Sequence, residues 1–304
     1  NRATGNRWAA AAAGLAALSD VKLVYESLAD LRPDIPLALI GVGSLCCFIN
    51  FLRRRSPVSF IACAILIALL PLVHSTGVLP AAMMLTCLAV SALIPSDGRL
   101  SRPYLLACAT LAVATVAIFV LRKPIMDGVI PTRVPLAYQL IGRHDMSAIL
   151  SGMAHGGLLW KLAEERQRWV SYFLPGNLPQ LLFLLAGLLA LLRAAWQRSS
   201  QRARWLWLPA GWIVGILALT VTDPHFTSTH LFSLIAMGYV MAGVGWALLL
   251  EGSRGTVPGT PAVLALAVLA FLGFGLRTAQ ASFDVYQGVH QGVSRAAVRS
   301  LLAR

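Results

Sequence analysis

Acidic side chains crowd into one short stretch of the chain, residues 20–34, which holds four of its twelve acidic residues: Asp20, Glu26, Asp30 and Asp34. Arg32 lies among them. A carboxylate can transfer a proton or bind a metal ion, and arginine binds a carboxylate or a phosphate through two parallel hydrogen bonds. Because the flanking sequence is apolar enough to cross a bilayer, the stretch is either a solvated loop with local ion pairs or a polar site at the membrane surface.

Histidines mark two further polar positions. His74 lies where two apolar runs meet, followed by Ser75, Thr76 and Gly77, and His225 and His230 precede a later apolar run. A histidine at membrane depth faces a cavity or a partner. A helix that begins after Ser75 or Thr76 would direct free backbone N–H groups toward an anion. The alternative at both places is helix capping beside an interfacial histidine.

The elements that must position these residues are membrane spans. The chain is 58% hydrophobic and 12% charged, whereas soluble domains carry about 25% charged residues. Its net charge of +13 lies in short tracts between apolar runs, which is typical of membrane loops and excludes nucleic acid as the partner. We predict an all-α, polytopic transmembrane bundle over 1–304, with nine spans of near-bilayer length at about 8–24, 35–52, 58–73, 77–94, 104–121, 179–193, 205–222, 229–250 and 260–277.

Arginine tracts predict the orientation of these spans. Tracts such as 53–55 and 193–204 mark the cytoplasmic side. The opposite, outer side then holds 20–34, His74, the long segment 122–178 and His225. We expect the five cysteines, all inside apolar runs, to be packing residues. The spans carry almost no charge, which argues against a proton- or sodium-coupled carrier.

The segment 122–178 is too long for a simple connection. We predict an amphipathic helix near 146–173, with Trp160, Trp169, Tyr172 and Phe173 in the headgroup layer and Glu164, Glu165, Arg166 and Arg168 in water. Such a helix would lie flat on the outer surface, or cover a site that takes its substrate from the lipid.

Three stretches carry a resemblance to a known family. They are TGNRWAAAAAGLAALSDVKLVYESLADLRPDIPLALI at 4–40, LLPLVHSTGVLPAAMMLTCLA at 69–89 and DPHFTSTHLFSLIAMGYVMAGVG at 223–245. In order and spacing the chain resembles the GT-C superfamily of membrane glycosyltransferases, particularly the bacterial relatives of protein mannosyltransferases and aminoarabinose transferases.

The resemblance implies transfer of a sugar from a polyprenyl-phosphate donor to an acceptor at the outer, periplasmic face of the cytoplasmic membrane. It implies that the main catalytic base lies in a loop upstream of Asn1, with Asp20, Glu26 and Asp30 in support. Arg32, Asp34 and His74 would bind the lipid phosphate and substrate, with His225 and His230 across the cavity. No resident cofactor is implied, and a divalent metal is left open.

Two other functions fit the same pattern. One is a carrier or flippase for a lipid-linked or anionic substrate, which would favour internal pseudo-symmetry, and no internal repeat is present in the sequence. The other is a membrane subunit without enzymatic activity. Neither the sugar nor the acceptor follows from the residues.

Overall fold

The computed structural model describes residues 6–20, 22–24, 34–54, 56–93, 106, 108–118, 121, 162–174, 177–196, 205–222, 228–252 and 271. Every regular element within these ranges is helical, which confirms the all-α class. The labelled helices are α1 (Arg7–Leu18), α3 (Asp34–Arg54), α4 (Pro57–Val73), α5 (Val78–Leu93), α8 (Leu178–Trp196), α10 (Trp207–Thr222) and α11 (Phe232–Gly252), with short 3-10 turns η1 (Ser75–Gly77) and η2 (Ser228–Leu231). Two further helices are Cys108–Ile118, which is apolar, and Leu162–Phe173.

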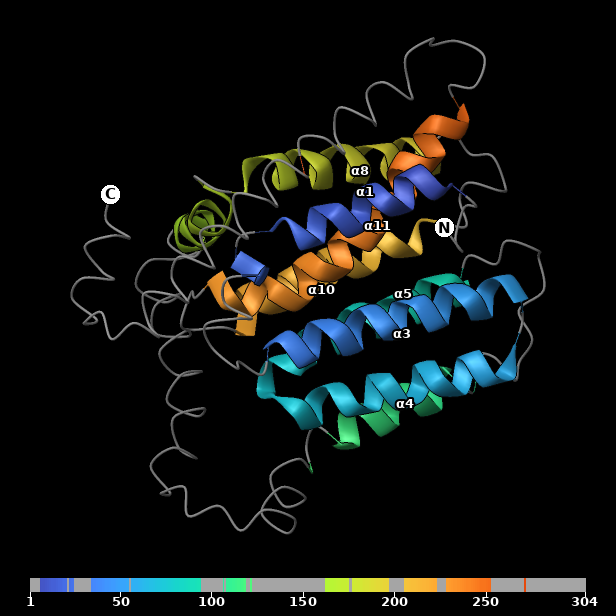
Figure 1. The fold of residues 1–304 in the computed structure, drawn as a ribbon. Helices are drawn as coiled ribbons and strands as arrows, with labels where there is room; N and C mark the ends of the chain where they lie inside the picture. The colour runs from blue at the N-terminus through green and yellow to red at the C-terminus, as the bar shows by residue number, and fades with distance from the viewer. Residues whose placement is uncertain are drawn as a thin grey trace, which may run out of the picture.

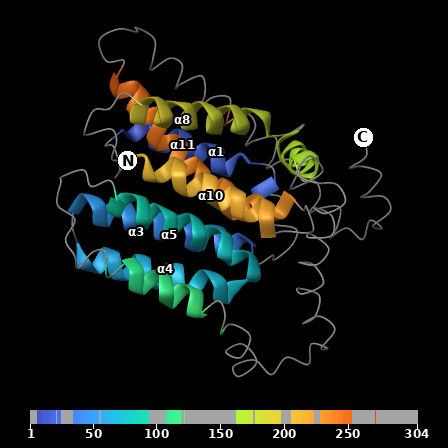
Figure 2. The ribbon, with the colours of Figure 1, turned by 180° about the vertical axis from the view of Figure 1, so that it is seen from behind.

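The long helices run side by side along one common direction (Figure 1). α3 lies in front of α5 in Figure 1 and behind it in Figure 2, and the two helices are in contact. α11 is the central helix, because it packs against α1, α3, α5, α8 and α10. The helix Leu162–Phe173 is bent by 117° from α8 and crosses one end of the bundle.

Helix ends follow from local sequence. Ser56 caps α4, where its hydroxyl accepts from the Ser59 N–H at 3.4 Å and Pro57 takes the first helical position. Asn6 caps α1 in the same way, accepting from the Ala9 N–H at 3.0 Å. Arg53 and Arg54 lie in the last turn of α3, where the negative end of the helix dipole favours positively charged side chains.

Span length separates the described helices into two groups. Within the described ranges, Ile35–Arg54 and Phe232–Leu250 are long and apolar enough to cross a membrane, and the bent pair Leu162–Phe173 with Leu178–Ala194 would make a third. α1, α4, α5, α10 and Cys108–Ile118 are apolar but shorter. The predicted nine spans are therefore confirmed only as a set of apolar helices, with two or three of spanning length. The predicted span 260–277, apart from Phe271, lies outside the described residues.

Two helices, α4 and α8, carry exposed apolar side chains at helical spacing on the outside of the bundle. In α4 the exposed large apolar side chains are Val58, Ile61, Ile65 and Leu69, and in α8 they are Leu178, Leu182, Leu185, Leu189, Leu192 and Trp196. Both sets repeat every three or four residues and so form one continuous stripe on each helix. Apolar stripes that face outward, away from a buried core, suit contact with lipid.

Candidate functional site

The carboxyl group of Asp20 accepts five hydrogen bonds. Asp20 follows Ser19, the C-cap of α1, and is fully buried. Its Oδ1 accepts from the backbone N–H groups of Lys22 at 3.0 Å and Leu23 at 3.1 Å, so it caps the turn that follows. This is the geometry of an N-cap aspartate, which satisfies donors at the start of a helical turn.

Three side chains from distant parts of the chain also donate to Asp20. The Tyr239 hydroxyl of α11 lies 2.5 Å from Oδ2, and the Tyr172 hydroxyl lies 2.9 Å from the same oxygen. Asn177 Nδ2 lies 2.8 Å from Oδ1. We refer to Asp20, Tyr172, Asn177 and Tyr239 as the Asp20 cluster. It ties α1 to the helix Leu162–Phe173, to the start of α8 and to α11.

The burial of Asp20 and its hydrogen bonds act in opposite directions on its protonation. Burial is the larger effect and raises the pKa of the Asp20 carboxyl above its ordinary value. The hydrogen bonds from Tyr239, the Leu23 backbone, Tyr172 and Asn177 lower that pKa and so offset part of the shift. With five donors around two oxygens, the carboxyl is held by the protein and is turned away from solvent.

A second polar contact joins α1 to α8 beside the cluster. Gln180 Nε2 donates to the Ser19 carbonyl at 2.9 Å and to the Ser19 hydroxyl at 3.1 Å. Asn177 also caps α8, since the Leu181 N–H donates to its carbonyl at 3.1 Å. Two polar residues at the start of α8, Asn177 and Gln180, therefore hold the end of α1 and the Asp20 that follows it.

The prediction that the charged residues of the helix Leu162–Phe173 face water is partly wrong. Glu165 and Arg168 are buried and form an ion pair with 3.3 Å between Oε1 and Nη1. Tyr172 and Phe173 are buried as well. The buried positions recur at helical spacing, as predicted for an amphipathic helix. The buried face, however, carries charges, and it packs on the bundle.

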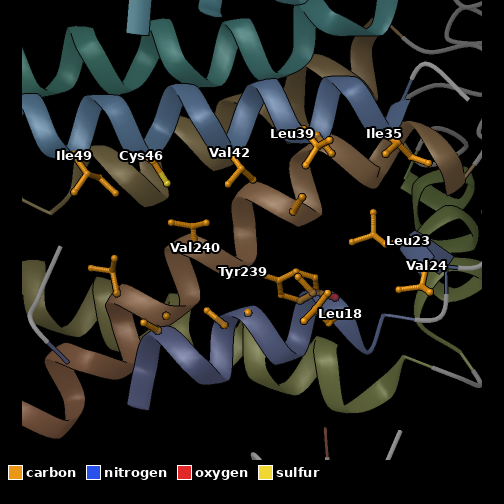
Figure 3. Close-up of a pocket in the computed structure, with 18 residues that line it drawn as sticks. Leu18, Leu23, Val24, Ile35, Leu39, Val42, Cys46, Ile49, Tyr239 and Val240 are labelled. Atoms are coloured by element: carbon orange, nitrogen blue, oxygen red, sulfur yellow. The ribbon is translucent and has the colours of Figure 1, made fainter. Parts of the chain in front are cut away.

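An apolar groove lies between α1 and α3, both of which pack on α11 (Figure 3). Its volume is about 670 Å³. From α3 it is lined by Ile35, Ala38, Leu39, Val42, Cys46 and Ile49. These residues occupy one face of the helix, so at a rise of about 1.5 Å per residue the groove runs along roughly 21 Å of α3.

One end of the groove meets the polar stretch picked out in the sequence. Leu18, Leu23 and Val24 line this end, while Ile49 lies at the other (Figure 3). Tyr239 lines the groove near Leu18. The backbone of Lys22, next to Leu23, is held by Asp20. The apolar groove thus ends beside a short segment that contains the acidic Asp20 and the basic Lys22.

His74 is the C-cap of α4, at the break before η1. Its Nδ1 lies 2.9 Å from the Thr76 hydroxyl and accepts from the Thr76 N–H at 3.3 Å. The Gly77 N–H donates to the His74 carbonyl at 3.0 Å. These contacts are those of a helix cap, which was one of the two interpretations of the sequence. His74 is half-buried, as is His230 in η2.

Of the sequence-predicted site residues, the structure places only some. Asp20 lies in its buried cluster, and Asp34 is the first residue of α3, its side chain outside what is described. Glu26, Asp30, Arg32 and His225 lie outside the described residues. Among the described residues, no group of three His, Cys, Asp or Glu side chains is placed to hold a metal ion.

The sequence interpretation missed the partners of Asp20. Tyr239 and Asn177 were not singled out, and Tyr172 was assigned to the headgroup layer. A polar residue within an apolar span was the available signal for Tyr239, because such groups are hydrogen-bonded when buried. Comparison with protein families, curated proteins and solved structures finds no match to this chain.

Proposed function

We propose that the chain is the membrane part of a glycosyltransferase that takes a sugar from a polyprenyl-phosphate donor at the outer face of the cytoplasmic membrane. The observation that carries the proposal is the apolar groove between α1, α3 and α11. An isoprenoid chain is apolar along its whole length and needs a long, narrow, apolar seat. A groove of roughly 21 Å covers much of a hydrocarbon layer about 30 Å thick.

The charges beside the groove suit the other part of such a donor. Leu23 and Val24 line the groove, and Lys22 precedes them in the chain. Ile35 also lines it, three residues after Arg32. In this proposal the phosphate of the donor lies at this end, where Arg32 binds it through its planar guanidinium. The apolar chain then extends along α3 toward Ile49.

The proposed position of the phosphate also suits the chemistry of sugar transfer. In transfer, an acceptor nucleophile bonds to the anomeric carbon of the sugar while the bond from that carbon to the phosphate oxygen breaks. Negative charge grows on the leaving phosphate, so cations placed there stabilise the transition state more than the bound donor. In the proposal Arg32 supplies such a cation, His74 contacts the phosphate, and His225 and His230 line the opposite wall.

Sugar transfer in membranes tests the proposal. Membranes that carry the full-length protein are given a polyprenyl-phosphate donor with a radiolabelled sugar, and the label in the acceptor is measured. Arg32→Ala should lower transfer about tenfold or more, because a hydrogen bond to a charged group contributes roughly 1.5–3 kcal/mol. His74→Ala should lower it as well.

The matched control is Arg53→Ala, which removes an exposed arginine at the opposite end of the groove helix. This variant should transfer as the wild type does. Wild-type transfer in both Arg32→Ala and His74→Ala would refute these site assignments. Movement of the lipid-linked label across the membrane with no new glycosidic bond would instead favour a carrier.

A further inference from the structure

Tyr239 belongs to two environments at once. Its side chain lines the apolar groove (Figure 3), and its hydroxyl donates to Asp20 Oδ2 at 2.5 Å. The acceptor is itself held by four other donors, so it cannot follow a moving ring without breaking other hydrogen bonds. The ring of Tyr239 is therefore held in one orientation, and with it one part of the groove wall.

We infer that Asp20 is a positioning residue for the apolar chain of the substrate, acting through Tyr239. The inference rests on the proposed function in that the groove is taken to hold an isoprenoid chain. Asp20 is buried and its two oxygens are fully engaged. It determines the shape of the groove by fixing the tyrosine ring, and so governs affinity for the lipid rather than the transfer step.

Tyr172 supplies a matched comparison within the same cluster. Its hydroxyl donates to the same Asp20 oxygen as that of Tyr239. Its ring, however, packs against Phe173 and Phe232, and it is not among the residues that line the groove. Both tyrosines stabilise the buried carboxyl, but only Tyr239 connects it to the groove. Removing one hydroxyl at a time separates a structural role from a positioning role.

The experiment uses the purified full-length protein and a photoreactive isoprenoid alcohol that carries a diazirine but neither phosphate nor sugar. Tyr239→Phe should weaken binding of this probe about threefold to tenfold, the range set by one lost hydrogen bond. Tyr172→Phe should change probe affinity less than about twofold, although both variants lose a hydrogen bond and melt at lower temperature. Equal effects of the two variants on probe affinity would overturn the inference.

A double-mutant cycle then tests whether Asp20 acts through Tyr239. Asp20→Asn should weaken probe binding in the wild-type background and have no further effect in the Tyr239→Phe background. Independent, additive effects would contradict the inference. The probe carries no sugar, so these results do not depend on transfer. Failure of every donor in the transfer assay would refute the proposed function and leave the binding result intact.

Discussion

Asp20 shows how one carboxyl group can organise several helices. A buried ionisable group is costly unless it is hydrogen-bonded, and an isolated carboxylate would not persist in an apolar bundle. Asp20 meets this requirement with two backbone donors and three side chains. Those side chains come from three elements, so the hydrogen bonds that satisfy the carboxyl also fix where the elements meet. Its first role in the structure is thus to join helices.

The raised pKa of Asp20 leads to a prediction about pH. A raised pKa means that the folded protein favours the protonated carboxyl. The stability that this group contributes is fully present below the unfolded-chain pKa of about 3.9 and is lost as pH rises through the folded-state pKa. Asp20→Asn has no titrating group at this position. The melting temperature of the wild type should therefore fall relative to that of the variant as pH rises from about 4.

This comparison is made by thermal unfolding of both proteins in the same detergent across a pH series. Other titrating groups are common to the two proteins, so their effects cancel in the difference. A difference that stays constant, or one in which the wild type gains stability with rising pH, would show that burial does not dominate the protonation of Asp20.

The sequence alone identified Asp20 as a residue of interest but not what holds it. Local ion pairs within the stretch 20–34 were the expected structural alternative, because its charged residues are neighbours in the chain. The observed partners Tyr172, Asn177 and Tyr239 are more than 150 positions away. Contacts of this kind depend on which helices are neighbours, and helix periodicity does not determine that order.

At the scale of elements, the contact between α8 and α11 depends on two glycines. A Cβ atom on Gly187 would overlap the backbone of Ala242, and one on Gly245 would overlap the carbonyl of Gly187. Helices approach this closely in membranes where small residues line the crossing. The central position of α11, of which 72% is buried against 44% for the comparable part of α3, depends on such close contacts.

Gly187→Ala should therefore destabilise the bundle by roughly 1–3 kcal/mol, the usual effect of forcing extra atoms into a packed interface. Gly14→Ala is the control, since a Cβ there meets nothing within 4 Å and alanine is the better helix former. Thermal unfolding should show a lower melting temperature for the first variant and an equal or higher one for the second. Equal melting temperatures for the two would contradict this packing.

The positions of several apolar helices were predictable from the sequence, whereas the direction in which their polar faces point was not. The apolar runs at 35–52 and 58–73 match α3 and α4 within a few residues. The run at 8–24 was expected to continue through Asp20, but α1 ends at Leu18. Glu165 and Arg168 were expected in water because both are charged. They are buried because they pair with each other on the packed face of their helix.

For the whole molecule, apolar residues lie both inside and outside the bundle. Stripes on α4 and α8 face outward, and a groove with an apolar lining lies between α1, α3 and α11. The end of α1, the end of α4 and the helix Leu162–Phe173 lie at one end of the bundle, and α3 ends at the opposite one (Figure 1). Asp20 follows the end of α1, and His74 follows the end of α4. This arrangement suits a substrate with one apolar and one charged part.

The most direct test fills the groove without disturbing the fold. Gly14 lines it, and a side chain there has open space before it. We predict that Gly14→Leu raises the KM for the polyprenyl-phosphate donor about tenfold relative to Gly14→Ala, with kcat unchanged, because binding common to the ground and transition states is lost. The same KM and kcat in the two variants would contradict a donor chain in this groove.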